Sequence, residues 1–161
     1  TATPSFRGRR IEAGLLSAGQ DFNKNTNPFS VGLGKFIDLD KKDFIGKNAL
    51  LNIKKNCRTW GLRVKESVAL KGENIFIEDK LIGRVTSSTW SPFQVCGVAI
   101  IHLNNDDNGP GSITDVKCSD GNLYKGEICK LPMYDEKNEI VRGLKINIPS
   151  NPEPWPGIQK N

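Results

Sequence analysis

Long apolar runs are missing from this chain of 161 residues. No stretch approaches the roughly 18 uninterrupted apolar residues of a membrane-spanning helix. The first ten residues, TATPSFRGRR, have no apolar core of the secretory type. With 37% hydrophobic and 25% charged residues, the composition predicts a globular protein that has no membrane partner.

Metal-binding and nucleophilic residues are also scarce. The single histidine, His102, follows an apolar segment and is expected to be structural, and no two cysteines are spaced as CxxC, so we expect no metal site. The scattered spacing of the four cysteines favours buried free thiols, which predicts a reducing compartment and hence a cytoplasmic protein. The alternative is that the four cysteines form two disulfides. They are Cys57, Cys96, Cys118 and Cys129.

Only one methionine, Met133, is present, and the chain begins at Thr1. We therefore expect that Thr1 is not a natural start and that the chain is the C-terminal portion of a longer protein. The formal charge of +5 would favour anionic ligands, but it is too scattered to predict nucleic-acid binding.

Residues 1–56 and the residues after them differ in pattern. In the first region, DFIGKNALLNIKK predicts a short amphipathic helix with Asp43 as its N-cap. Phe36, Ile37 and Leu39 suggest a short extended segment before it. This region has too few elements to close a core alone, so we expect the α+β end of a larger domain.

Residues 57–135 are typical of an all-β domain. NIFIED and LIGRVTS predict a hairpin that turns at Asp79-Lys80, and a second hairpin turns at Asp120-Gly121. CGVAIIHL is more continuously apolar and should be the more buried strand. Five or six short strands predict a small barrel of distorted jelly-roll or Greek-key type. Residues 136–161 form a proline-rich tail.

Two polar clusters are candidate sites. In RRIEAGLLSAGQD, Arg10 either ends a helix in solvent or points into a site, where a guanidinium can bind an anion or stack on a heterocycle. Glu12 is then a possible part of the site rim. In GRVTSSTWSP, Trp90 either covers one end of the barrel or forms part of a ligand rim.

Three segments, in this order, resemble the C-terminal part of the aminomethyltransferase (glycine cleavage T-protein) superfamily. They are RIEAGLLSAGQD, NPFSVGLGKFIDLDKKDFIGKNAL and GRVTSSTWSP, and the resemblance covers roughly Arg9 to Lys130. It implies that residues 1–56 are the end of the folate-binding domain and that residues 57–135 are its C-terminal barrel. It also implies that Arg10 lies in the folate and substrate site.

The resemblance further implies an enzyme that transfers a one-carbon unit to tetrahydrofolate. Its partners would be a small-molecule donor or a lipoylated carrier protein, together with the N-terminal remainder of the same protein. The family's key aspartate and glutamate lie in that remainder, so this chain contains no catalytic residue and should be inactive alone.

Two departures keep other functions open. Ala18 stands where many members have a tyrosine, and Trp90 stands where T-proteins commonly have a smaller residue. A tryptophan at this position more closely resembles dimethylsulfoniopropionate demethylase or a related subgroup. Such an enzyme would transfer a methyl group from a sulfonium or methylamine donor. The alternative of another class is a non-catalytic β-barrel that binds a partner through its basic faces.

Overall fold

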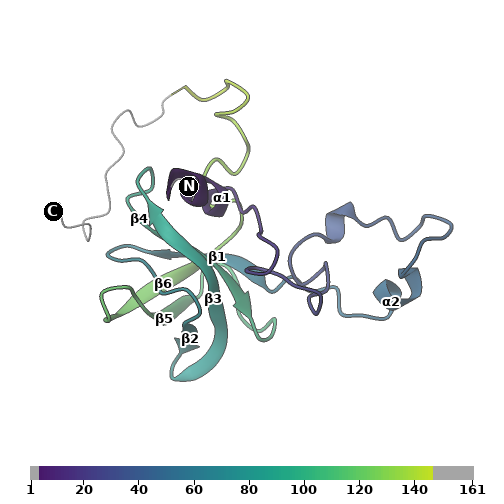
Figure 1. Ribbon diagram of the computed structural model, residues 1–161, viewed down its shortest axis with the longest axis horizontal. Helices are drawn as coiled ribbons and strands as arrows, with labels where there is room; N and C mark the ends of the chain where they lie inside the picture. The colour runs from purple at the N-terminus through teal and green to yellow at the C-terminus, as the bar shows by residue number, and fades with distance from the viewer. Residues whose placement is uncertain (1–3, 147–161) are drawn as a thin grey trace.

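A closed barrel of six antiparallel strands forms the centre of the computed structural model, which describes residues 4–146 (Figure 1). The strands are β1 (Thr59–Val64), β2 (Asn74–Ile77), β3 (Lys80–Ser91), β4 (Cys96–Leu103), β5 (Ile113–Lys117) and β6 (Leu123–Cys129). Their order around the barrel is β1-β4-β3-β2-β5-β6, and β6 pairs with β1. The predicted small barrel is confirmed.

The first four strands form a Greek key. Strands β2, β3 and β4 are successive neighbours, and β1 lies on the far side of β4. The jelly-roll form of the prediction is wrong, because a single sheet of six strands closes on itself here instead of folding into the two sheets of an eight-stranded roll.

Alternate side chains of the strands fill the barrel. The buried interior cluster consists of Leu62, Val64, Ala69, Ile75, Ile82, Val85, Ala99, Ile101, Leu103, Val116, Cys118 and Ile128. Strand β4 also buries its outer face, where Val98 and Ile100 pack against Ile11. Because both faces of β4 are covered, its sequence has no polar alternation, as its continuous apolar run predicted.

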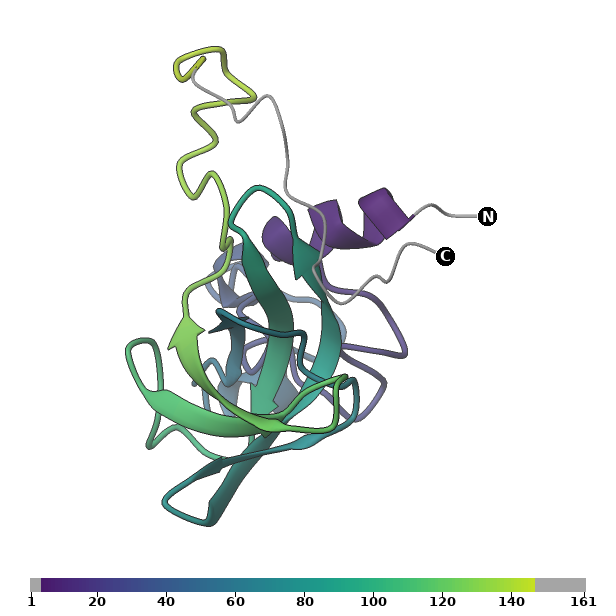
Figure 2. The ribbon, with the colours of Figure 1, turned by 90° about the vertical axis from the view of Figure 1, so that its left-hand side faces the viewer.

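Helix α1 (Pro4–Glu12) covers that outer face of the barrel (Figure 2). It ends at a glycine in the left-handed conformation, Gly14, whose φ is +69°. The N–H of Leu15 donates to the carbonyl of Arg10, and the N–H of Gly14 donates to the carbonyl of Ile11. This pair of bonds is a Schellman cap, so Gly14 lies at the helix end, where glycine is favoured.

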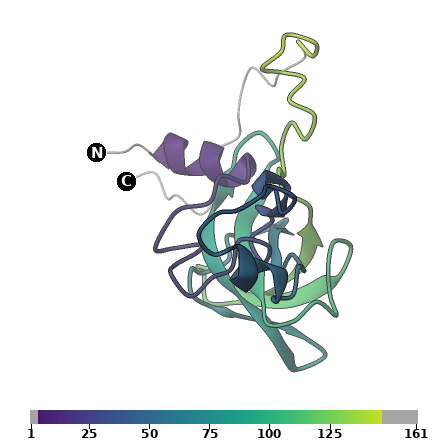
Figure 3. The same ribbon diagram turned by 90° about the vertical axis from the view of Figure 1, so that its right-hand side faces the viewer.

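The segment between α1 and β1 forms a lobe beside the barrel. In Figure 3 this lobe lies in front of the barrel. Its only regular elements among the described residues are a 3-10 turn (Gly34–Phe36) and helix α2 (Lys47–Leu51). The expected α+β end of a domain over residues 1–56 is therefore wrong in its β part. Only one isolated bridge, between Ala18 and Phe22, lies in the described part of that region.

Helix α2 is shorter than predicted. It begins after Gly46, which has a φ of +90°, and Asp43 is not its N-cap. The left-handed conformation of Gly46 stops the helix from extending towards Asp43. None of its residues is buried, and the adjacent Ile45 is fully exposed. The apolar side of the predicted helix is thus only partly covered, since Phe44, Leu50 and Ile53 are half-buried.

The hairpin between β2 and β3 turns one residue earlier than predicted. Its two turn residues are Glu78 and Asp79, which both have positive φ, as a type I′ turn requires. The turn at Asp120-Gly121 is confirmed, since it joins β5 to β6 and Gly121 has a φ of +87°. The prolines of the predicted tail beyond residue 146 lie outside the described residues.

Candidate functional site

Arg10 joins helix α1, the following loop and the barrel. One of its terminal nitrogens donates to Asp21 Oδ2 at 2.8 Å and to the carbonyl of Leu15 at 3.0 Å. The other donates to Ser87 Oγ on β3 at 2.7 Å and to Gln20 Oε1 at 3.4 Å. Only 12% of its side chain is exposed. Both terminal nitrogens of the guanidinium are therefore bonded within the chain.

Asp21 is the buried centre of this network. Its side chain is fully buried, and besides Arg10 its carboxylate accepts hydrogen bonds from Thr86 Oγ1, Ser87 Oγ and the backbone N–H of Ser17. Burial alone would raise the pKa of Asp21, but these bonds together outweigh it and lower the pKa below its ordinary value. Asp21 is therefore held as a carboxylate that locks the loop onto β3.

Sequence reasoning missed Asp21, Thr86 and Ser87 as members of the site. Asp21 and Ser87 lie 66 positions apart in the chain, and no local pattern pairs them. A signal was nevertheless present, because Asp21 ends the segment that contains Arg10, and Thr86 and Ser87 lie within GRVTSSTWSP. Two of the three family-like segments thus meet at one buried carboxylate.

Glu12 is a buried connection and not an open carboxylate. Its side chain is 3% exposed, accepts a hydrogen bond from Ser91 Oγ on β3, and lies 4.0 Å from the guanidinium of Arg9. Its backbone carbonyl accepts the N–H groups of Met133 and Tyr134. Glu12 therefore links α1 to the end of β3 and to the chain that leaves the barrel.

An apolar cleft of about 280 Å³ lies between α1 and residues 134–141. Its lining residues are Phe6, Arg9, Arg10, Glu12, Ala13, Leu15, Tyr134, Asp135, Asn138, Ile140 and Val141. Arg10 and Glu12 thus line the same cleft. Trp90 does not line it. Trp90 is half-buried on β3 opposite Gly97, and its backbone carbonyl lies near Gly8 of α1.

Two residues that line this cleft, Arg9 and Tyr134, also contact the ring of Phe93. The guanidinium carbon of Arg9 lies 4.3 Å from the centre of the Phe93 ring, and the Phe93 and Tyr134 rings are 5.8 Å apart. Phe93 lies in the turn between β3 and β4. The turn between β3 and β4 is thus tied to both walls of the cleft, which are α1 with the residues just after it and the chain after β6.

The single histidine has a structural partner. His102 Nδ1 lies 3.0 Å from Thr59 Oγ1, across the β1-β4 pair, and is half-buried. Burial, together with the charges of Arg58 and Arg84, lowers the pKa of His102. No group of His, Cys, Asp and Glu side chains that could hold a metal ion lies among residues 4–146.

All four cysteines are free thiols, in agreement with the sequence prediction. Cys96, Cys118 and Cys129 are buried, and Cys57 is half-buried. Burial raises the pKa of Cys118 and of Cys129 to about 11. Within the described residues, no helix has both the length and the apolar character needed to cross a membrane.

Comparison with known proteins gives one consistent result. Residues 58–135 match the family model of the glycine cleavage T-protein C-terminal barrel domain. The chain is 35% identical over 130 residues to the aminomethyltransferase of Prochlorococcus marinus, and this match covers 78% of the chain and 35% of that protein. It is 33% identical over 124 residues to the aminomethyltransferase of Aquifex aeolicus, with 76% and 35% covered.

A solved structure agrees on the fold. The crystal structure of glycine cleavage system aminomethyltransferase T from Bartonella henselae superposes with a TM-score of 0.70 at 23% identity, covering 81% of this chain and 38% of that one. The barrel is thus of the T-protein C-terminal type. The chain belongs to the aminomethyltransferase superfamily and corresponds to its C-terminal part. It spans about a third of the length of the curated relatives it matches.

Proposed function

We propose that this chain is the C-terminal part of an enzyme that transfers a one-carbon unit to tetrahydrofolate, as a glycine cleavage T-protein does. The observation that carries the proposal is the 35% identity over 130 residues to a protein named aminomethyltransferase, because a match of that length includes both the barrel and much of the segment before it. We further propose that the protein is cytoplasmic and that its donor is held by a lipoylated carrier protein or is a small molecule.

The apolar cleft beside α1 suits one part of a folate. Apolar side chains dominate its lining, and the Arg10 guanidinium lies on its wall with its hydrogen-bonding ends occupied. A planar guanidinium stacks on aromatic and heteroaromatic faces. We therefore propose that Arg10 contacts the folate or the substrate through its face, while the Asp21 and Ser87 bonds hold that face in place.

The residues of this chain would then bind and orient, while proton transfer would depend on carboxylates elsewhere in the full protein. Glu12 fixes the cleft by joining α1 to Ser91 and to the backbone at Met133. Its carboxylate is occupied by Ser91, so we give it a positioning role. When bound, tetrahydrofolate supplies the amine nitrogen that accepts the one-carbon unit.

A chimera tests the proposal. Residues Phe6 to Val141, which include the whole lining of the cleft beside α1, would replace the corresponding segment of the Aquifex aeolicus aminomethyltransferase. Tetrahydrofolate-dependent release of the one-carbon unit from an aminomethylated lipoyl carrier would be measured. We expect turnover by the chimera and none by the 161-residue chain alone. A folded chimera without turnover on this donor would count against the T-protein assignment.

The same assay tests the demethylase alternative, which Trp90 favours. Methyl transfer from a sulfonium or methylamine donor would replace aminomethyl transfer in the chimera if that alternative holds. Since Trp90 lies on β3 and does not line the cleft beside α1, its substitution by leucine should leave the choice of donor unchanged in a T-protein.

A further inference from the structure

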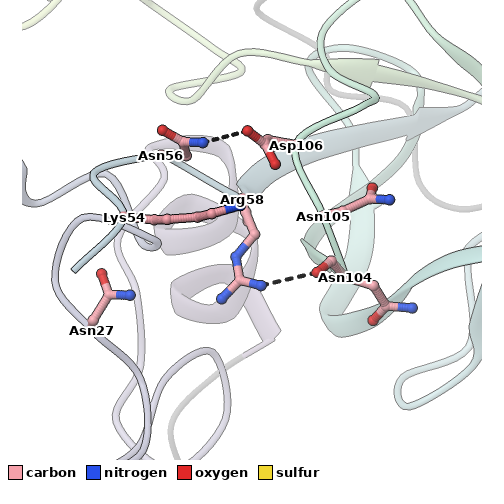
Figure 4. Close-up of a pocket in the computed structure, with 7 residues that line it drawn as sticks. All are labelled: Asn27, Lys54, Asn56, Arg58, Asn104, Asn105 and Asp106. Atoms are coloured by element: carbon pink, nitrogen blue, oxygen red, sulfur yellow. Dashed lines mark hydrogen bonds between the residues drawn. The ribbon is translucent and has the colours of Figure 1, made fainter.

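A second, polar cleft lies between the lobe and the end of strand β4 (Figure 4). It encloses about 160 Å³ and is lined by Asn27, Lys54, Asn56, Arg58, Asn104, Asn105 and Asp106. We call it the Arg58 cleft. All seven of these side chains are polar or charged, which suits a small polar ligand better than an apolar one.

Two cations of the Arg58 cleft have no carboxylate partner within the described chain. Arg58 donates one hydrogen bond, to the backbone carbonyl of Asn104 at 2.9 Å, which leaves other donors of its guanidinium unused by residues 4–146. Lys54 is exposed, and in Figure 4 its side chain runs towards the backbone of Arg58. The three ion pairs of the described residues involve other side chains. Two cations that line one hollow without a carboxylate partner favour an anion there.

The amide of Asn27 adds a neutral donor to the same wall. Its side-chain oxygen accepts the N–H of Ser30 at 2.9 Å, and its backbone carbonyl accepts the Ser30 hydroxyl. These bonds hold the amide group in position. Its NH2 group donates to no residue between 4 and 146, and it is thus available to a bound oxygen.

One carboxylate on the rim restricts which anion fits. Asp106 accepts a hydrogen bond from the side-chain amide of Asn56, which spans the cleft between the lobe and the barrel (Figure 4). A bare oxyanion would be repelled by Asp106. An anion that also carries a hydroxyl or ammonium group would instead donate a hydrogen bond to it.

We propose that the Arg58 cleft binds a small carboxylate that carries a hydroxyl or amino group on the adjacent carbon. The carboxylate lies between Lys54 and Arg58, and the hydroxyl or ammonium group faces Asp106. The Arg58 cleft is separate from the cleft beside α1. Ser87, which binds Arg10, lies opposite Ile100. Asn104 follows Ile100 by four residues, which places the two about 13 Å apart at the usual rise of a strand. The inference does not depend on the proposed enzymatic function.

Three ligands of nearly equal shape test this proposal. Lactate, alanine and propionate differ only in carrying a hydroxyl, an ammonium or a hydrogen on the same carbon. Each would be titrated into the 161-residue chain while the backbone amide NMR signals of Asn56, Arg58 and Asn105 are followed. We expect lactate or alanine to bind with a dissociation constant on the order of 1 mM, and propionate about tenfold more weakly. Preference for lactate or for alanine distinguishes a hydroxy acid from an amino acid.

Matched variants locate the binding. Lys54→Gln and Arg58→Gln should each weaken the preferred ligand about tenfold, while Lys137→Gln and Arg142→Gln, at exposed positions outside the cleft, should leave it unchanged. Lys54 makes no hydrogen bond within residues 4–146, so its variant should fold normally. Asp106→Asn should remove the preference over propionate.

Three results would overturn the proposal. The first is the absence of a saturable shift up to about 50 mM of any of the three ligands, a concentration well above the expected dissociation constant. The second is equal affinity for propionate and its two analogues. The third is equal weakening by Lys54→Gln and by its control Lys137→Gln, which would show a general charge effect.

Discussion

The guanidinium of Arg10 and the carboxylate of Asp21 meet at 2.8 Å, and the Asp21 side chain has no exposed surface. Eleven positions separate the two residues, and the pair ties the end of α1 to the loop that follows it. Ser87 bonds both of them and extends the connection to β3. The candidate site is therefore built on a buried charge pair, which is costly to break from one side only.

Removing the carboxylate should destabilise the chain strongly. Asp21→Ala leaves the Arg10 guanidinium largely buried without its counter-charge, and the free energy of unfolding should fall by about 3–5 kcal/mol. Denaturant unfolding measures this loss. Asp115→Ala is the matched control, because its pair with Lys125 has a largely exposed ammonium and should contribute under about 1 kcal/mol. Equal losses in the two variants would show that Asp21 is not the anchor of the loop.

The same carboxylate should make stability depend on acid. Its pKa in the folded chain lies below the ordinary value of 3.8, so its contribution is complete above that value and is lost as the pH falls through the folded pKa. The difference in unfolding free energy between the wild-type chain and Asp21→Asn should thus shrink as the pH is lowered from about 6 to about 3. A difference that stays constant over this range would contradict a lowered pKa.

The helix end should be sensitive to a single methyl group. Gly14 has a φ of +69°, and a Cβ there would lie 3.0 Å from the Leu131 side chain. Gly14→Ala should reduce the unfolding free energy by more than about 1 kcal/mol, since both strain and contact oppose it. Gly19→Ala separates the two causes, because Gly19 has a φ of +79° but faces open space. An equal loss of unfolding free energy in both variants would show that the contact with Leu131 adds nothing to the cost of the backbone strain.

The barrel could be predicted from the sequence because its signals are local. Alternating residues define the strands, and the unbroken apolar run of β4 indicates that both of its faces are covered. The barrel interior covers one face, and α1 covers the other through Ile11. The lobe was predicted less well. Lys47–Leu51 has a helical pattern, but a glycine at φ +90° precedes it and none of its five residues is fully buried. Pattern alone cannot show whether an apolar face finds a partner within the chain.

The candidate site was only half predictable for a related reason. The segment that contains Arg10 could be singled out from its composition, but what Arg10 touches depends on the register of β3 against β4 and on the path of the loop after Gly14. Ser87 faces Arg10 only because a bulge shifts the register between Val85 and Ser87. No sequence pattern specified that bulge.

The four thiols should differ in reactivity. Thiol titration of the denatured chain without reductant should find all four, since none is paired. In the native chain the half-buried Cys57 should react first, whereas the buried Cys118 and Cys129, with pKa values of about 11, should stay unreactive near neutral pH. Two or no thiols in the denatured chain would mean that disulfides form.

Arg10 and Arg7, both on α1, provide the sharpest test of the site. Arg10→Ala in the active chimera should weaken binding of tetrahydrofolate or of the donor about ten- to a hundredfold, because a charge-assisted or stacked contact and the geometry of the cleft are lost together. Arg7→Ala removes the same charge from an exposed side chain of α1 that does not line the cleft, and should change binding little. Arg10→Lys separates the two causes, since lysine keeps the charge near Asp21 but has no planar face. Calorimetric titration measures affinity, and thermal unfolding of each variant shows whether the fold is intact. Equal affinities of folded Arg10→Lys and of the unsubstituted chimera would make Arg10 a purely structural partner of Asp21.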